Sequence, residues 1–145
     1  MIDLKEASLT PAEWEIMRVA WTAKETTSKE VSDILNDKMN WKPVTTKTLI
    51  GRLVKKGFLK TEQDGKRYLY SPAVEEDECL LHASGELFEH VCQTKKGELL
   101  AKWIEESLLS QSDLDAINAI VEKKKETAPS TVACECTPGQ CDCNH

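Results

Sequence analysis

Two short runs with strand-like composition constrain the fold of this chain more than any other feature. They cover residues 58–62 and 66–70, and they follow a segment whose apolar residues recur at helical spacing. Asp64-Gly65 lies between the runs, and this dipeptide tolerates the positive φ angles of a tight turn. The pattern therefore predicts a β-hairpin that follows a helical segment.

Helix start signals precede the hairpin at two places. Thr10 can cap a helix whose first residue is Pro11, and Glu13 completes a T-x-x-E capping box. Thr27 and Glu30 repeat the same spacing at the start of a second helix. These signals predict two helices before residue 40.

A third helix is predicted over about residues 44–56, directly before the hairpin. Leu49 and Leu53 are among its inward-facing apolar residues, and Gly57 is placed to end it in a left-handed conformation. Three helices followed by a hairpin are the layout of a winged helix-turn-helix. The sequence thus predicts a mainly α fold with a small β-hairpin, and a winged-helix DNA-binding domain over residues 1–73.

The net charge of −6 conceals an asymmetry between the two halves of the chain. Residues 1–73 hold 13 basic and 10 acidic side chains, whereas residues 74–145 hold 6 basic and 15 acidic ones. The segment from Lys42 to Arg67 contains eight basic residues and only two acidic ones, Glu62 and Asp64, which gives a local net charge of +6. Such a concentration predicts a surface that meets a polyanion. The alternative is an ordinary solvated helix face.

The third helix and the hairpin tip supply the candidate contacts to double-stranded DNA. Hydroxyl groups near a helix N-terminus reach phosphates or bases, and an arginine can bond the edge of a guanine bidentately. The predicted contacts are Thr45, Thr46, Lys47, Thr48, Arg52 and Lys55 on the helix and Lys66 and Arg67 in the hairpin.

The second half of the chain predicts three more helices, each strongly apolar on one side, the last starting at Ser112. These three helices are too short to form a hydrophobic core on their own, so pairing with a second copy of the chain is expected to bury their apolar faces. The alternative is that they pack on the chain's own first domain. The sequence thus predicts a helical dimerisation domain over residues 74–126 of a homodimer. The predicted dimerisation residues are Leu80, Leu87, Phe88, Val91, Leu100, Trp103, Ile104 and Ile117.

Residues 127–145 are predicted to form a linker and a flexible, cysteine-rich metal-binding tail. Four cysteines have the spacing C-x-C-x4-C-x-C, with the turn dipeptide Pro138-Gly139 between the two pairs. Thiolates suit Zn(II) and Cu(I), and four of them fill a tetrahedral zinc site. The single-residue gap in each pair suits compact clusters in which Cu(I) ions share thiolates. The predicted ligands are Cys134, Cys136, Cys141 and Cys143.

The remaining features predict a cytoplasmic protein that is not an enzyme. The N-terminus lacks the layout of a secretory signal, and no apolar run approaches the roughly 18 residues of a membrane span, so no membrane partner is expected. Thiols stay reduced in the cytosol, which weighs against disulfides. Cys79 and Cys92 are predicted to be small core hydrophobes. No arrangement of side chains points to catalysis.

Three separated segments resemble the BlaI/MecI/CopY family of bacterial winged-helix repressors. They are LTPAEWEIMRVAW (residues 9–21), TTKTLIGRLVKKGFL (residues 45–59) and YLYSP (residues 68–72), in the order of the family. The tail CECTPGQCDC resembles the signature of the copper-responsive members and is absent from the antibiotic-responsive ones.

The resemblance implies a dimeric repressor that binds a palindromic operator ahead of copper-transport genes. It further implies that a zinc-loaded form holds the DNA, and that Cu(I) donated by a copper chaperone releases it. The thiolates alone leave a zinc- or cadmium-responsive repressor open. A metal-storage or metal-transfer module, a different class of protein, is also open, although such a module needs no basic helix and wing.

Overall fold

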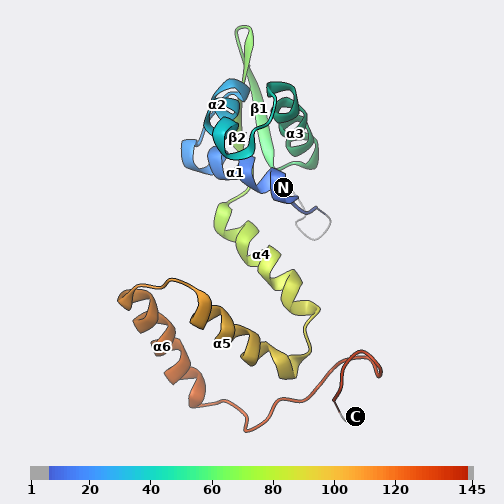
Figure 1. Ribbon diagram of the computed structural model, residues 1–145, viewed down its shortest axis with the longest axis vertical. Coiled ribbons are helices and arrows are strands. Elements are labelled where there is room, and N and C mark those ends of the chain that lie inside the picture. Colours follow the sequence, from blue (N-terminus) through green and yellow to red (C-terminus); the bar gives the residue numbers. More distant parts are fainter. Residues whose placement is uncertain (1–6, 144–145) are drawn as a thin grey trace. The chain divides into compact units, whose positions relative to one another are not determined.

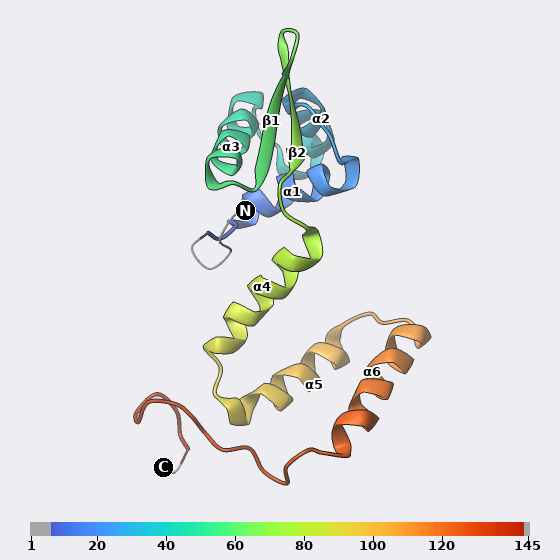
Figure 2. The same cartoon turned by 180° about the vertical axis from the view of Figure 1, so that it is seen from behind.

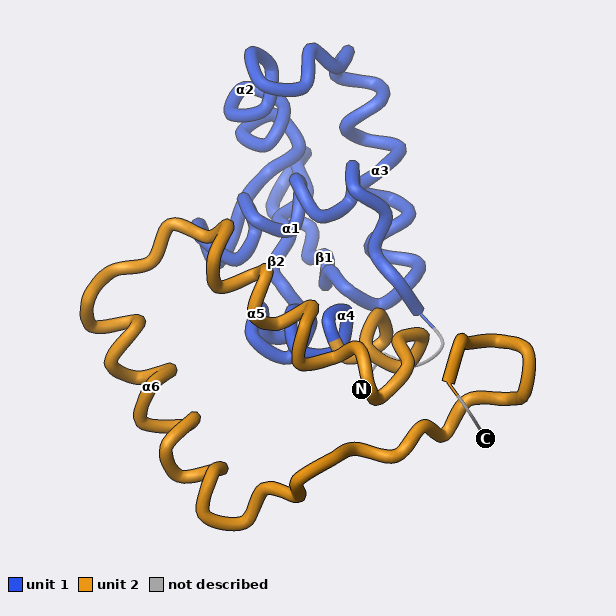
Figure 3. The backbone as a smooth tube through the Cα atoms, turned by 60° about the horizontal axis from the view of Figure 1, so that its bottom comes forward, with its two compact units in different colours: residues 1–84 blue, residues 85–145 orange. Residues whose placement is uncertain are grey.

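The computed structural model describes residues 7–143 and confirms a mainly helical chain with one antiparallel hairpin (Figure 1). The chain divides into two compact units, residues 1–84 and 85–145 (Figure 3). Each unit is described by itself.

The first unit has the element order of a winged helix-turn-helix. Three helices are followed by a hairpin whose strands stand beside them and whose tip extends beyond them (Figure 2). An isolated bridge pairs Thr26, before the second helix, with Tyr70 of the second strand, which therefore has a partner on both sides. The elements are α1 (Pro11–Ala23), α2 (Ser28–Met39), α3 (Pro43–Lys56), β1 (Leu59–Asp64) and β2 (Arg67–Pro72).

The helix caps confirm the sequence signals in detail. The Glu13 amide donates to the Thr10 hydroxyl at 3.2 Å, and the Thr10 amide donates back to the Glu13 carboxylate at 2.9 Å. Thr27 caps α2 through the Glu30 amide at 3.2 Å. Gly57 ends α3 with a φ of 89°, in the left-handed region that favours glycine.

The hairpin register places its turn one residue later than the sequence pattern suggested. Leu59 pairs with Pro72 at the open end and Asp64 pairs with Arg67 at the tip, so Gly65 and Lys66 form the two-residue loop. Gly65 has a φ of 64°, which a two-residue hairpin loop of this kind requires.

A single hydrophobic core holds the first unit together. Among its largest fully buried side chains are Ile16, Met17, Ile50, Leu53 and Phe58, drawn from α1, α3 and the start of the hairpin. Core packing extends past the predicted domain end at residue 73. Cys79 is 4% exposed within this core, and the Trp21 indole donates a hydrogen bond to the Val74 carbonyl at 3.0 Å. These contacts attach the start of the next helix to the first unit, which extends to residue 84.

A buried ion pair connects α1 to the end of α3. The Glu13 side chain is 1% exposed, and the Lys56 ammonium donates to its Oε1 at 2.6 Å. Burial by itself would raise the pKa of Glu13, but the Lys56 side chain and the Thr10 hydrogen bonds outweigh it and hold the pKa below its ordinary value of 4.5.

The helices after the hairpin are α4 (Glu76–Glu89), α5 (Lys96–Glu106) and α6 (Gln111–Lys125), with a short 3₁₀ helix, η1 (Gln93–Lys95), before α5. The last helix begins earlier than predicted, because its cap is Ser110 rather than Ser112, with Asp113 completing a capping box. Neither α5 nor α6 contains a buried residue. Within residues 7–143, no helix is both long and apolar enough to cross a bilayer.

Removal of the Lys56 charge is expected to destabilise the first unit. Lys56→Met leaves the Glu13 carboxylate buried without its cation, which we expect to cost about 1–3 kcal/mol in unfolding free energy at pH 7. Urea denaturation followed by tryptophan fluorescence measures this, since Trp14, Trp21 and Trp41 all lie in the first unit. Lys29→Met is the control, because it removes an exposed ion pair with Asp33 and should cost well under about 1 kcal/mol.

The same pair gives the stability a defined pH dependence. Because the folded-state pKa of Glu13 lies below its unfolded value, its contribution is complete above about pH 4.5 and is lost as the pH falls through the folded pKa. The wild-type protein should therefore lose more stability between pH 6 and pH 3 than Glu13→Gln, which has no carboxylate to protonate. Equal losses in both proteins would contradict this role of Glu13.

Candidate metal centre and nucleic-acid surface

The outer face of α3 presents most of the predicted DNA contacts to solvent. Thr45, Lys47, Thr48, Arg52 and Lys55 are all exposed. Among the residues that the structure describes, none forms an ion pair with the three cations of this group. The face therefore carries unneutralised positive charge beside hydroxyl groups, as a phosphate-binding surface requires.

Thr46 is the exception among the predicted contacts. Its side chain is 1% exposed and belongs to the interior of the first unit, as do those of Leu49, Ile50 and Leu53 on the same helix. A buried hydroxyl cannot reach DNA, so the prediction of a contact for Thr46 is wrong. Adjacent residues on a helix point about 100° apart, so Thr46 can face inward although its neighbours Thr45 and Lys47 are exposed.

Gly51 lies on the exposed part of α3, next to Arg52. A methyl group built at its α-carbon would meet no atom within 4 Å. Packing between elements of the first unit therefore does not require a glycine at this position. The small residue instead leaves the backbone of α3 open to close approach from outside the unit.

The hairpin tip carries the two remaining predicted contacts. Lys66 is exposed in the two-residue loop, and Arg67 is exposed at the start of β2. The Arg67 guanidinium donates to Asp64 across the turn at 3.3 Å. Of the two cations at the tip, Arg67 is paired with Asp64, whereas no ion pair is found for Lys66 among the described residues.

The predicted dimerisation residues form apolar surface that the single chain leaves uncovered. None of the eight is buried, and several are largely exposed, with Leu80 at 48%, Leu87 at 49%, Leu100 at 45% and Trp103 at 38%. In the second unit, Phe88 of α4 and Trp103 of α5 make an edge-to-face contact with ring centroids 5.3 Å apart. This contact joins the two helices without shielding either face from solvent.

A cluster of thiols is the main polar feature of the second unit. The sulfur atoms of Cys92, Cys134, Cys136 and Cys141 all lie within 4.8 Å of one another. The sulfurs of Cys134 and Cys141 lie 3.2 Å apart, and those of Cys92 and Cys134 lie 3.6 Å apart. None of the six cysteines, all of which lie within residues 7–143, forms a disulfide.

The cluster differs from the predicted ligand set in one of its four members. Three tail cysteines gather as predicted, but the fourth sulfur of the group comes from Cys92. The Cys143 sulfur lies beside the group, 3.7 Å from the sulfur of Cys92 and 3.5 Å from the Thr94 hydroxyl. The structure therefore brings five thiols together, four in the tail and one in the segment before η1.

Cys92 is buried at 8% exposure, but not within the hydrophobic core. α4 ends at Glu89, so Cys92 lies beyond the helix on which the sequence pattern placed it, in the turn before η1. The apolar spacing that continued to residue 92 hid this break, and no local signal links Cys92 to a tail some 40 residues away. Cys79, in contrast, is in the core as predicted.

The sulfur positions fit a thiolate metal site. Four sulfurs at about 2.3 Å from a tetrahedral zinc ion lie roughly 3.8 Å from one another. The sulfurs of Cys134 and Cys141, 3.2 Å apart, and those of Cys92 and Cys134, 3.6 Å apart, are near this spacing. Cys92, Cys134, Cys136 and Cys141 would hold a single Zn(II), with Cys143 adjacent, and the same soft donors suit Cu(I).

The thiols of the cluster differ in how readily they lose a proton. Hydrogen bonds from Thr94 lower the pKa of Cys92 to about 6. The Cys136 amide lowers the pKa of Cys134, but the neighbouring thiols of Cys141 and Cys92 outweigh it, and the pKa is raised. The Cys92 thiol also raises the pKa of Cys136. Since thiolates this close repel one another, a bound cation is needed before all of them can ionise.

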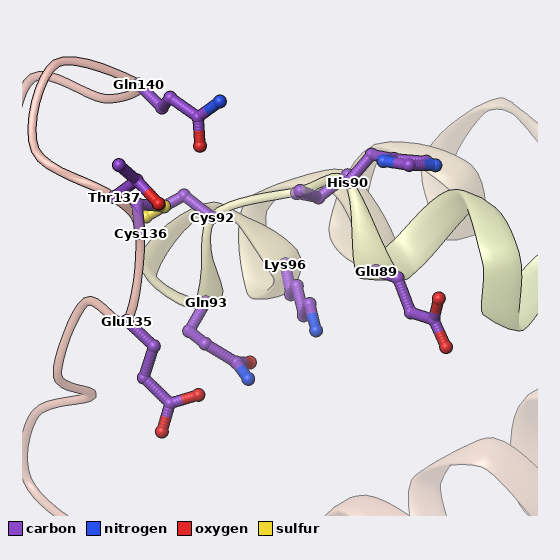
Figure 4. A pocket seen from close by; sticks show the side chains of 10 residues that line it. Glu89, His90, Cys92, Gln93, Lys96, Glu135, Cys136, Thr137 and Gln140 are labelled. Carbon is purple, nitrogen blue, oxygen red and sulfur yellow. The ribbon is translucent and has the colours of Figure 1, made fainter.

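An open cavity of about 670 Å³ borders the cluster. Cys92 and Cys136 line it together with Glu89, His90 and Lys96, among others, and Figure 4 shows the tail passing alongside the turn that carries Cys92. The cluster can therefore be reached from solvent through a polar opening.

The chain is similar to known bacterial repressors and regulators. Residues 9–123 match the family model of the penicillinase repressor. The chain is 47% identical over 135 residues to an uncharacterized 16.5 kDa protein in the ptsI 3′ region of Latilactobacillus sakei, covering 93% of this chain and 92% of that protein. It is 30% identical over 123 residues to the methicillin resistance regulatory protein MecI of Staphylococcus aureus, covering 85% of this chain and all of MecI.

Among solved structures, the DNA-binding domain of the repressor BlaI is similar, with a TM-score of 0.47 and 31% identity over 54% of this chain and 93% of that one. The named relatives are repressors and regulators rather than enzymes, in agreement with the prediction of no catalysis. The family match ends before the four tail cysteines and includes Cys92.

Proposed function

The chain belongs to the penicillinase repressor family, and we propose that it is a copper-responsive member of it. A zinc-loaded homodimer holds a palindromic operator of copper-homeostasis genes, and Cu(I) releases it by replacing zinc at the cysteine cluster. The observation that carries this proposal is the group of four thiols within 4.8 Å of one another, three of which belong to a tail that lies outside the family match.

Operator binding is assigned to the exposed face of α3 and the hairpin tip. The surface consists of seven of the eight predicted contacts, without Thr46: Thr45, Lys47, Thr48, Arg52, Lys55, Lys66 and Arg67. In winged-helix proteins the recognition helix enters the major groove, where an arginine can distinguish a guanine. Arg52, exposed and without an ion pair among the described residues, is the leading candidate for such a contact.

The dimer is assigned to the apolar faces of α4, α5 and α6. Isolated exposed leucines are ordinary on protein surfaces, but a continuous apolar stripe marks an interaction surface. A second copy is the occupant that fits, because a palindromic operator requires two linked DNA-binding domains. Burial of this surface also supplies the core that α5 and α6 lack within one chain.

Copper is favoured over other soft metals by the spacing of the tail thiols. Each C-x-C pair places two sulfurs close together, as suits Cu(I) ions that share thiolates. One Zn(II) carries the same charge as two Cu(I), so exchange of one for two on the same thiolates leaves the charge of the site unchanged. The response must then come from a change in the geometry of the cluster. A copper chaperone is the expected donor, and the open cavity beside Cys92 and Cys136 offers it access.

The central experiment is a titration of the protein–DNA complex with metals. The operator is first selected from a random duplex library by the zinc-loaded protein, and the complex is then followed by gel shift under anaerobic conditions. Buffered Cu(I) should release the DNA, whereas Zn(II) and Cd(II) should not. Release by Zn(II) or Cd(II) would identify a zinc- or cadmium-responsive repressor instead, and binding that no metal alters would contradict metal sensing.

Replacement of Cys134, Cys136, Cys141 and Cys143 by serine should remove the copper response. Serine hydroxyls stay protonated and are hard donors, so they hold neither metal strongly. Because we propose that zinc creates the DNA-competent arrangement, this variant should bind the operator weakly with or without copper. Full operator affinity in the variant would exclude that role of zinc while leaving copper sensing intact.

Arg52→Ala should weaken operator binding by about 1–3 kcal/mol and relax base preference at one position of each half-site. Lys102→Ala removes an equal charge from the exposed surface of α5 and serves as the control, with affinity expected to be unchanged. Fluorescence anisotropy over a series of salt concentrations measures both variants. A loss that is the same on all sequences would assign Arg52 to phosphate rather than base contact.

Leu87→Asp should convert the dimer to a monomer and abolish tight operator binding. It places an unpaired charge in the apolar contact between copies, at a cost of several kcal/mol. Leu81→Asp is the matched control, since Leu81 is 74% exposed and lies roughly 120° away around α4. Analytical ultracentrifugation distinguishes the states. A Leu87→Asp protein that stays dimeric would move the interface to another surface.

A further inference from the structure

The position of Cys92 among the tail thiols carries an inference beyond the proposed ligand set. We propose that Cys92 is itself a ligand of the metal, so that the metal fastens the tail to the turn between α4 and α5. This inference rests on the proposed function only in taking the cluster as a metal site. It requires neither copper selectivity nor operator binding.

The distances favour Cys92 over Cys143 as the fourth ligand. Cys92 belongs to the group whose sulfurs all lie within 4.8 Å of one another, and Cys143 does not. The Cys92 sulfur is 3.6 Å from that of Cys134, close to the spacing of roughly 3.8 Å in a tetrahedral thiolate site. Cys143 contacts the Cys92 sulfur at 3.7 Å, but it is not one of the four sulfurs that all lie within 4.8 Å of one another.

Local structure holds the Cys92 side chain toward the tail. Cys92 precedes η1 with an extended ψ of 136°, and the Thr94 hydroxyl lies 3.1 Å from its sulfur. The same hydroxyl lies 3.5 Å from the Cys143 sulfur. Thr94 can therefore orient one thiol as a ligand while it contacts the neighbouring one, as groups around metal ligands commonly do.

Ligation by Cys92 would couple the metal to the helices assigned to the dimer. Cys92 lies between α4 and α5, and the edge-to-face contact of Phe88 with Trp103 joins those helices close to it in sequence. A metal on Cys92 restrains this turn directly. A tail that held its metal with its own four cysteines would have no covalent connection to the turn except through the linker after α6.

The test compares metal affinity in single-cysteine variants of the full-length protein. Zn(II) affinity is measured by competition with a chelator of known affinity. Removal of a group that only contacts a metal ligand lowers metal affinity by about 10–100-fold. Removal of a ligand itself should have at least this effect, so Cys92→Ser should lower the Zn(II) affinity at least tenfold. Cys79→Ser, which removes the thiol in the core of the first unit, should leave Zn(II) affinity unchanged. Cys143→Ser should cost less than Cys92→Ser.

Two further measurements separate ligation from a merely structural role of Cys92. In Cys92→His, the imidazole offers another zinc ligand and should recover part of the affinity lost in Cys92→Ser. In the wild-type protein loaded with ¹¹³Cd(II), scalar coupling should connect the cadmium nucleus to the β-protons of Cys92. Unchanged Zn(II) affinity in Cys92→Ser, or cadmium coupling to the four tail cysteines without Cys92, would overturn the inference. Neither result bears on the proposed copper response, which the metal titration of the operator complex tests separately.

Discussion

The orientation of α3 depends on a carboxylate that is almost entirely removed from water. Glu13 accepts hydrogen bonds from the Thr10 amide at 2.9 Å and the Lys56 ammonium at 2.6 Å, so one side chain fixes the start of α1 and the end of α3. Lys56 donates in addition to the Ser8 carbonyl at 3.1 Å. Because these bonds act on the inner side of α3, its outer side is left for Arg52 and Lys55. Two adjacent lysines thus serve different purposes, Lys56 in the fold and Lys55 on the surface, and the local charge excess overstates the charge available to DNA.

Within residues 85–143 of the second unit no charged side chain is buried, so this interaction has no equivalent there. No residue of α5 or α6 is buried, and the contact of Phe88 with Trp103 leaves Trp103 38% exposed. Apolar surface of this kind is unfavourable in water and is expected to be covered. In the proposed dimer a second copy covers the helices, and the metal secures the tail. The first unit is therefore specified by its own core, whereas the second is completed by partners.

Features of the fold that depend on neighbouring residues could be predicted from the sequence. The capping box of Thr10 and Glu13, the glycine end of α3 and the hairpin all follow from residues within a few positions of one another. The tail cysteines were found for the same reason, because their spacing is itself the signal. The turn position shifted by one residue, since Asp64 and Gly65 together suit either placement of the loop.

Contacts between distant residues could not be predicted in this way. Cys92 lies 42 positions from Cys134, and its place at the end of an apolar pattern indicated a core residue. It is indeed buried, but it lies beside the tail thiols and outside the hydrophobic core. Thr46 differs from its exposed neighbours because adjacent residues on a helix point about 100° apart, so it lies on the inward face with Leu49 and Leu53. A sequence pattern also does not reveal that Cys79 packs into the core of the preceding helices.

Charge conservation in the proposed metal exchange restricts how the signal can travel. If one Zn(II) is replaced by two Cu(I) on the same thiolates, repulsion between the cluster and DNA stays constant, and only the positions of the ligands change. A coupling of about 1–3 kcal/mol, typical of allosteric proteins, must then arise from the strain or freedom of a segment attached to those ligands. The tail alone is a poor candidate, because its linker follows the last helix. The turn at Cys92 joins two helices whose apolar faces are assigned to the dimer, so a ligand change there acts on the relative placement of those faces. In this arrangement the same sulfur that completes the metal site also connects it to the dimer.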